Sequence, residues 1–431
     1  MRFNCLFIIA LAICSSGADA RYKVAPSEEC NNGRLRKSVL TPPQEMPGRA
    51  RELERLLACL GPTAAPLTAA NAAYELAMHH AGADGGTRDF RAAATWARRS
   101  VDYLKRVHVP DLRRKTRLAA IRLDYYAAET AAELQAVARD LDALVVSCRI
   151  GKDADAQCAE SLKLFGDVQR DLSGKGNAQS SQRAINAFRR FLQTRDGEKR
   201  GPDRASALVD KGTLIAQAPE GSLTSEEIDE AVAALREATE FFRNERDEPR
   251  ERLAQVNLGA VLAGRRSAHA ASLDEAERLL RPLVESSDTT ISPAIRLTAQ
   301  RNLGSVLAKK QTGNHQKNLD EAIVLLRAAH AAVSKNDVRN WIKTGENLAL
   351  VLQSSGLKVF QNLGEAKAVL EEVLGAAKQA GMRNETSAIL SSLVTVRLRR
   401  KAIREDEDLQ GVGDLLIACA CDWHKESTRT S

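Results

Sequence analysis

The stretch NLGSVLAKKQTGNHQKNLDEAIVLLRAA, from Asn302 to Ala329, holds two apolar segments of helical spacing joined by a polar loop. Its first half recurs as NLGAVLAGRR from Asn257 and as NLALVLQSSG from Asn347, with a period of 45 residues. Its second half recurs at intervals of 44 to 46 residues, as IDEAVAALREA, LDEAERLLRPL and LGEAKAVLEEV. A two-helix unit of this length, repeated in tandem, is typical of an α-solenoid, in which each unit buries its apolar face against its neighbour.

Each half of the repeat has its own packing pattern. In the second helix Ala322, Leu326 and Ala329 follow the i, i+4, i+7 spacing of one amphipathic face. In the first helix Gly259 and Gly304 stand where glycine costs helix stability, so we expect another helix to approach closely there. The sequence therefore predicts pairs of packed helices and an all-α fold.

The NLG and DEA segments, with their regularly spaced Leu and small residues, resemble tetratricopeptide repeats, most specifically over residues 205–380. The period of about 45 residues exceeds the family's 34 or so, the family's aromatic positions are mostly Leu, and its closing proline is absent. This long-period variant implies a right-handed solenoid of about seven antiparallel helix pairs. The resemblance also implies a concave groove, lined by the first helix of each pair, that binds an extended peptide or a partner helix.

Weaker copies of the helical pattern extend upstream, where Ile185, Leu134 and Phe90 mark the second helices of earlier pairs. The regions are predicted as follows: 1–20 a signal peptide, 21–64 a partly irregular N-terminal segment, 65–204 divergent helical repeats, 205–400 the tetratricopeptide-like repeats, and 401–431 a C-terminal cap and tail.

The first 20 residues read as a secretory signal peptide. Arg2 precedes the short apolar run CLFIIALAIC, and Ala18-Asp19-Ala20 fits a small-x-small cleavage site before Arg21. Cys14 leaves open a lipoprotein signal, although Ile13 occupies a position that needs a small residue. We expect an exported protein, periplasmic or secreted, with no membrane span in the mature chain.

Composition argues against nucleic-acid binding. Lys and Arg number 63 against 56 Asp and Glu, a formal net charge of +7 that is interspersed along the chain. Aromatic residues make up only 4%, whereas proteins that bind bases concentrate basic charge and supply aromatic side chains for stacking. We therefore expect a protein or peptide partner, and the mild positive charge suits an acidic one; the sequence does not indicate an oligomeric state.

Removal of the signal peptide leaves six cysteines, an even number that suits disulfides in an oxidising compartment. Cys148 and Cys158 flank a short loop between two helices, and Cys30 could pair with Cys59. The remaining two lie in CACDWH, where Cys419 and Cys421 are a third disulfide pair, buried thiols or, alternatively, ligands of a soft metal ion.

The search for catalytic motifs is negative. The chain has no GxxxxGK[ST], GxGxxG, HExxH or GxSxG, so we expect no enzyme activity, no cofactor and no metal. His79 and His80 are adjacent, so on a helix their side chains diverge by about 100° and cannot share a metal.

The resemblance places a row of residues from successive first helices in or beside the groove. Asn257, Asn302 and Asn347 would bond a peptide backbone; the alternative is that these amides bond only within the solenoid. The flanking positions would tune specificity, and Lys309 would add positive charge. These positions are Val256, Ala260, Arg301, Ser305, Glu346 and Leu350.

These observations predict an exported, non-enzymatic scaffold for protein interaction. Two alternatives stay open. One is an exported helical-toroid hydrolase or lyase with acidic residues on the concave face, and the other is a regulatory subunit of a separately encoded peptidase or envelope complex.

Overall fold

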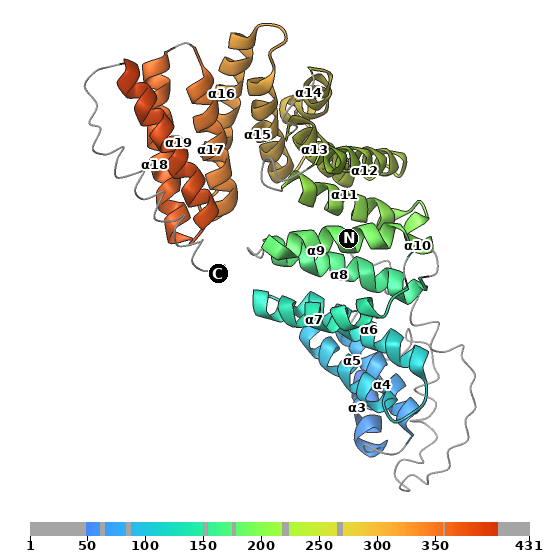
Figure 1. The fold of residues 1–431 in the computed structure, drawn as a ribbon. Helices are drawn as coiled ribbons and strands as arrows, with labels where there is room; N and C mark the ends of the chain where they lie inside the picture. Colours follow the sequence, from blue (N-terminus) through green and yellow to red (C-terminus); the bar gives the residue numbers. More distant parts are fainter. Residues whose placement is uncertain are drawn as a thin grey trace. The chain divides into compact units, whose positions relative to one another are not determined.

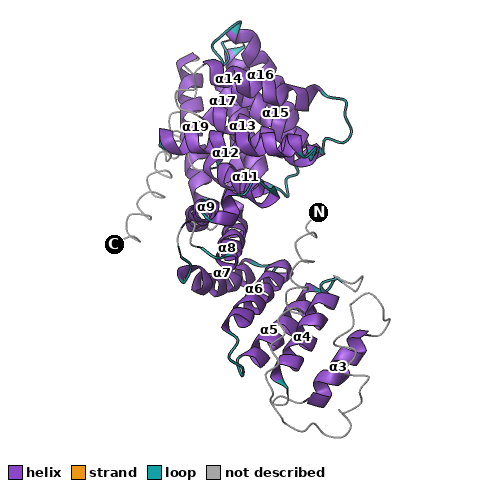
Figure 2. Cartoon of the chain, turned by 90° about the vertical axis from the view of Figure 1, so that its right-hand side faces the viewer, coloured by secondary structure: helices purple, strands orange, loops and turns teal. Residues whose placement is uncertain are grey.

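The computed structural model describes residues 49–60, 65–82, 88–149, 151, 154–174, 178–217, 224–264, 270–356 and 358–403. Within these ranges every regular element is a helix and no strand occurs (Figure 2). The chain divides into two compact units, residues 1–200 and 201–431, and each is described by itself. The predicted signal peptide and the end of the C-terminal tail lie outside the described residues.

The first unit contains eight described helices, and α3 to α9 each pack against the next along the chain. Their bounds are α3 (Arg49–Leu60), α4 (Pro66–His80), α5 (Phe90–Leu104), α6 (Pro110–Ala127), α7 (Ala131–Val146), α8 (Ala156–Gly174), α9 (Ala178–Leu192) and the short α10 (Arg195–Glu198).

The second unit contains nine described helices that also pack in sequence order (Figure 1). Their bounds are α11 (Pro202–Ala216), α12 (Ser225–Asn244), α13 (Glu248–Gly264), α14 (Ala270–Glu285), α15 (Pro293–Lys309), α16 (His315–Ala332), α17 (Val338–Ser354), α18 (Val359–Gln379) and α19 (Arg383–Ile403).

The helices begin where the sequence supplies suitable first residues. Thr130 and Thr224 form capping boxes with Glu133 and Glu227. In each box the Thr hydroxyl accepts a hydrogen bond from the Glu backbone N–H, and the Glu carboxylate accepts one from the Thr backbone N–H. Proline stands in the first turn of α4, α6, α11 and α15, where its missing N–H costs no hydrogen bond.

The core of the second unit is the apolar stripe that the repeat pattern predicts. Ala322, Leu326 and Ala329 are fully buried on α16, as are Ala366, Leu370 and Val373 on α18. Gly304 lies against Leu326, because a Cβ atom at Gly304 would be 2.6 Å from Leu326 Cγ. Because Gly304 has no side chain, Leu326 of the paired helix can pack directly against its backbone.

The same glycine contact recurs in other helix pairs. Gly259 faces Leu280 between α13 and α14, and Gly212 faces Leu235 between α11 and α12. In the first unit Gly166 of α8 lies in the same way against Phe188 of α9. This packing identifies α8 and α9 as a pair of the same internal construction.

Salt bridges join each even-numbered helix of the second unit to the next. In each case the Glu of the DEA or GEA segment accepts from an Arg of the preceding repeat, and the residues are half-buried or exposed. The pairs are Arg236–Glu275 at 2.6 Å, Arg281–Glu321 at 2.7 Å and Arg327–Glu365 at 2.8 Å. We call this series the Arg–Glu ladder.

The odd-numbered helices of the second unit also contact one another, whereas the even-numbered helices make no contact of similar extent. The repeats are therefore closer together on the side of α11, α13, α15, α17 and α19, which is the inner side of the array. The prediction of an all-α solenoid is confirmed, and seven helix pairs are present in the described part of the chain.

Candidate binding surface

The inner side of the second unit carries a row of residues at positions i, i+4, i+7 and i+11 of each odd-numbered helix. We call this row the inner stripe. It consists of Leu253, Asn257, Ala260 and Gly264 on α13; Thr298, Asn302, Ser305 and Lys309 on α15; Lys343, Asn347, Leu350 and Ser354 on α17; and Ala388, Ser392, Thr395 and Arg399 on α19. All except Asn302 are at least partly exposed.

Every asparagine of the stripe donates a hydrogen bond to the preceding odd-numbered helix. Asn257 Nδ2 bonds Thr213 Oγ1 at 2.7 Å, Asn302 Nδ2 bonds the buried backbone oxygen of Val256 at 3.2 Å, and Asn347 Nδ2 bonds Ser305 Oγ at 3.2 Å. These amides bond within the solenoid, which is the alternative that the sequence left open, and they join consecutive repeats.

The basic residues at the end of the stripe donate hydrogen bonds to backbone oxygens near the ends of neighbouring helices. Lys309 Nζ donates to the backbone oxygen of Ala263 at 2.9 Å, and Arg399 Nη1 donates to that of Gln353 at 2.6 Å. Both acceptors lie in the last turn of the preceding odd-numbered helix, where a cation satisfies orphan carbonyls and suits the helix dipole.

Beside the stripe, the expected row of specificity residues is only partly accessible. Val256 is fully buried, so the expectation that its side chain tunes specificity is wrong. Arg301 is half-buried: its Nη1 donates to Asn340 Oδ1 at 2.9 Å, while its buried Nε has no hydrogen-bond partner among the described residues. Burial lowers the pKa of Arg301, and Asp337 partly offsets this effect.

Glu346 is half-buried on α17 and forms no ion pair within 4 Å among the described residues. Burial raises the pKa of its carboxyl to about 7, the negative charge of Glu385 acts in the same direction, and Lys343 opposes both. A carboxyl of this kind changes charge close to neutral pH.

Lys343 also lies on this surface. Its side chain is exposed, yet neighbouring helices reduce its hydration and lower its pKa, and Arg301 and Arg339 lower it further while Glu346 raises it. Exposure and reduced hydration are compatible on an inward-facing surface, where protein atoms surround a group that solvent still reaches.

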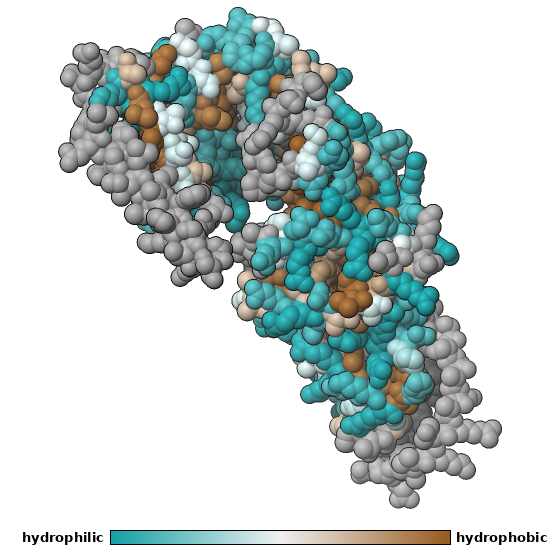
Figure 3. All heavy atoms as spheres, in the orientation of Figure 1, coloured by the Kyte–Doolittle hydropathy of each residue, from teal (hydrophilic) through white to brown (hydrophobic). Residues whose placement is uncertain are grey.

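Leu350 is the most exposed large apolar residue of the stripe, at 60% of its full accessibility. Hydrophobic patches on the surface in Figure 3 are small and are separated by hydrophilic residues. An exposed Leu flanked by small polar groups can anchor an apolar side chain of a ligand.

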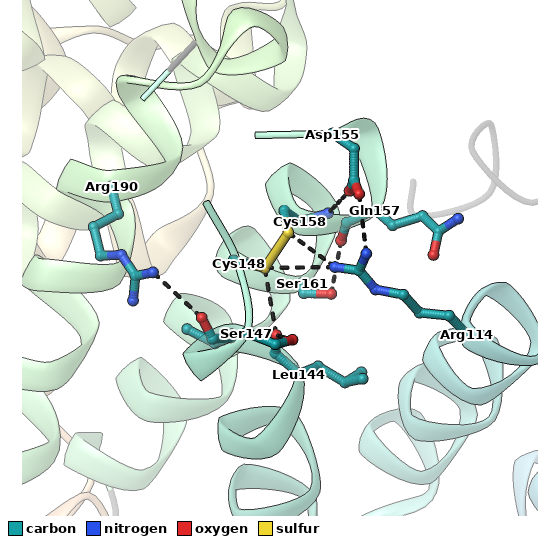
Figure 4. Close-up of a disulfide and its surroundings, with 10 residues drawn as sticks. Arg114, Leu144, Ser147, Cys148, Asp155, Gln157, Cys158, Ser161 and Arg190 are labelled. Atoms are coloured by element: carbon teal, nitrogen blue, oxygen red, sulfur yellow. Dashed lines mark hydrogen bonds and ion pairs between the residues drawn. A yellow bond between two sulfur atoms is a disulfide. The ribbon is translucent and has the colours of Figure 1, made fainter. Parts of the chain in front are cut away.

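Cysteines were the other group of candidate residues. Cys148 and Cys158 form a disulfide, with a Cα–Cα distance of 5.4 Å, in agreement with the predicted bridge across the loop (Figure 4). Cys59 lies on α3, while Cys30, Cys419 and Cys421 fall outside the described residues, so their pairing stays a prediction.

In the part of the chain that the structure describes, no group of three or more His, Cys, Asp or Glu side chains is placed to hold a metal ion, and the CACDWH segment lies outside that part. No helix within the described ranges combines the length and apolar character needed to cross a membrane.

Comparison with known proteins adds little. No family model and no curated protein matches the chain. One solved structure that does match is a "circular tandem repeat protein with novel repeat topology and enhanced subunit contact surfaces". It is 14% identical, 99% of this chain and 96% of that chain are covered, and the TM-score of 0.25 is too low to support an argument about fold or function.

Sequence reasoning missed three features of the second unit. Lys343 was not singled out, although it lies on the same face of its helix as Asn347 and Leu350. The Arg partner of the repeated Glu was also missed, although an Arg follows each Glu by six residues in three repeats. The close packing of Gly212 against Leu235 was not predicted, because no NLG segment surrounds Gly212.

Proposed function

We propose that this chain is an exported, non-enzymatic scaffold that binds an extended peptide or a partner helix along the inner stripe of α13, α15, α17 and α19. Ser305, Lys343, Leu350 and the flanking Arg301 and Glu346 would contact the ligand, and the stripe asparagines and Lys309 would add contacts beside their bonds within the solenoid.

The observation that carries this proposal is the composition of the stripe. Its side chains are mostly small or polar, with Leu350 exposed at 60% and no carboxylate between Leu253 and Arg399 on the stripe itself. Small hydroxyl side chains can bond a peptide backbone without selecting its sequence, and one apolar contact fixes the register of the ligand.

The resemblance to long-period tetratricopeptide repeats supports the same function, because the first helix of each pair lines the groove in that family. Export is supported by the sequence of residues 1–20 and by the Cys148–Cys158 disulfide, since disulfides persist mainly in oxidising compartments. We place the protein in a periplasm or outside the cell.

The test is site-specific photo-crosslinking in the native envelope or secreted fraction, with the photoreactive residue at position 350 or at position 324. Val324 on α16 is a matched control, because it is 61% exposed but lies on an even-numbered helix. A partner captured at 350 alone should then bind the purified protein, and Leu350→Asp should weaken that binding at least tenfold while Val324→Asp does not. Equal binding by both variants would exclude the inner stripe.

A hydrolase or lyase is the second candidate, because Glu346 carries a raised pKa and lies near Glu385, as a general acid beside a second carboxylate would. Any hydrolytic activity of the purified protein should then disappear in Glu346→Gln, while Leu350→Asp affects mainly KM. An activity that survives Glu346→Gln would remove this candidate.

The regulatory-subunit reading differs from a scaffold in the stability of its complex. It predicts that the captured partner is an enzyme that co-purifies at fixed stoichiometry and whose kcat changes when this protein is added. A partner without enzymatic activity would contradict it.

A further inference from the structure

The Cys148–Cys158 disulfide has an unusual electrostatic environment. Cys148 follows the end of α7, and Cys158 lies in the first turn of α8 (Figure 4). Arg114 of α6 places Nη2 2.9 Å from Cys158 Sγ and 3.7 Å from Cys148 Sγ, so one guanidinium contacts both sulfur atoms. An ordinary structural disulfide is neutral and needs no such cation.

A guanidinium has a clear effect once the disulfide is reduced. It stabilises a thiolate, and the N-terminus of α8 adds a partial positive charge at Cys158. Cysteines with an adjacent cation or at a helix N-terminus have pKa values of roughly 3.5–7.5, compared with about 8.5 for a free thiol. Both features favour Cys158 as the thiolate.

Two features act in the opposite direction. The Asp155 carboxylate accepts from Arg114 Nη1 at 2.9 Å and from the Cys158 backbone N–H at 2.7 Å, so it shares the cation and the helix end. Burial of Cys158 also disfavours charge. Arg114 nevertheless contacts the sulfur directly, whereas Asp155 bonds the backbone of Cys158, so the cation has the larger effect.

From this arrangement we propose that Cys148–Cys158 is a redox-active disulfide, a site for thiol–disulfide exchange with a dithiol reductant, in which Cys158 is the leaving thiolate. This site is independent of the proposed binding function, because it lies in the first unit. The reductant would be a protein or a small molecule with two neighbouring thiols.

The exchange is balanced in two steps. A thiolate of the reductant attacks Cys148 Sγ, the Cys148–Cys158 bond breaks, and its electron pair passes to Cys158 Sγ beside Arg114. The second thiolate of the reductant then attacks the reductant's other sulfur atom, which is bonded to Cys148 in the mixed disulfide. Cys148 leaves as a thiolate and takes a proton. The protein disulfide has gained two electrons, and the dithiol has become a disulfide.

Reduction need not unfold this region. The bridge spans only ten residues of sequence, so it constrains the unfolded chain less than a bridge across a long loop. The helices that it joins, α7 and α8, also pack directly against each other. The helix pair can therefore stay folded after the bond is broken, but both cysteines are buried, so the reductant reaches Cys148 Sγ through a local opening.

The test measures the equilibrium constant for reduction by dithiothreitol in the full-length chain, with the Cys148 and Cys158 peptides quantified by mass spectrometry. Arg114→Leu should lower this constant at least tenfold, which corresponds to about 30 mV. Asp155→Asn, which keeps the helix cap but removes the negative charge, should raise it. The control is Arg113→Leu, an exposed neighbour, which should leave it within about twofold.

A second measurement addresses the thiolate itself. In Cys148→Ser the rate of alkylation of Cys158 by iodoacetamide should rise with pH around a midpoint at least one pH unit below that of a free thiol, and Arg114→Leu should move it upward. Equal reduction constants for the Arg114 and Arg113 variants, or a midpoint for Cys158 at or above about 8.5, would overturn the proposal.

Discussion

The side chain of Leu326 occupies the space that any side chain at Gly304 would need. A Cβ atom at Gly304 would lie 2.6 Å from Leu326 Cγ and 3.1 Å from its Cδ2. Gly259 has the same relationship to Leu280, one repeat earlier, where the nearest distance is 2.8 Å. The glycine in the NLG segment and the Leu seven residues after the first Leu of the LDEA segment are therefore one packing unit, repeated along the chain.

Gly304→Ala should lower the free energy of unfolding by about 1–3 kcal/mol, because the added methyl group must displace Leu326 within a packed core. Gly375→Ala is the matched control, since Gly375 is exposed within α18 and a Cβ there meets no atom within 4 Å. Alanine at that position should stabilise the helix by up to about 1 kcal/mol. Chemical denaturation of both variants measures the difference, and a neutral Gly304→Ala would show that the pair packs less tightly than described.

Leu326→Ala should lower the free energy of unfolding by about 2–5 kcal/mol, because it leaves a cavity between α15 and α16. Val324→Ala on the same helix should change it by less than about 0.5 kcal/mol, since Val324 is 61% exposed. Urea denaturation monitored by circular dichroism distinguishes the two. Similar losses for both residues would mean that the assigned face of the helix is wrong.

Asn302→Ala tests whether the stripe asparagines serve the fold. The substitution removes the 3.2 Å hydrogen bond to the buried Val256 carbonyl, which still accepts from the backbone N–H four residues on in α13, so it should cost about 0.5–1.5 kcal/mol of unfolding free energy. Asn186→Ala, at an exposed position of α9, should cost less than about 0.5 kcal/mol. If Asn302→Ala instead keeps its stability but loses partner binding, the amide serves the ligand.

The pH dependence of stability should report on Glu346. Its pKa is raised from 4.5 to about 7 in the folded chain, so between these values the folded state holds a proton that the unfolded state has released. The free energy of unfolding should therefore fall as pH rises through this window, and Glu346→Gln should flatten the curve. Glu385→Gln should move the window to lower pH.

Urea midpoints between pH 4.5 and pH 8 provide the measurement. Parallel curves for the wild type and Glu346→Gln would show that this carboxyl titrates normally.

The sequence predicted the helix pairs and their buried faces because burial imposes a period that survives in the residue pattern. Ala322 and Leu326 illustrate this, and so do the glycines of the NLG segments. Hydrogen bonding was harder to predict. Whether Asn302 bonds Val256 or a ligand depends on the small offset between neighbouring helices, which periodicity does not fix.

Ion pairs between residues one repeat apart were equally difficult to predict from the sequence. Glu321 of the DEA segment lies opposite Arg281, 40 residues earlier, and the repeat period alone does not place these two side chains together. The raised pKa of Glu346 likewise depends on burial between helices that the sequence leaves far apart.

The Arg–Glu ladder has a consequence for how such a chain can change in length. The helices α14 and α16 each carry both the Glu and the Arg of the ladder, so either can follow any even-numbered helix that carries the matching Arg. Loss of one complete period of 45 residues would bring Glu321 opposite Arg236, with each glycine still facing its own Leu. A gene encoding this array can therefore gain or lose whole repeats by unequal recombination and still encode neighbours that fit, whereas loss of a partial repeat would separate the Arg and the Glu on the two sides of the deletion.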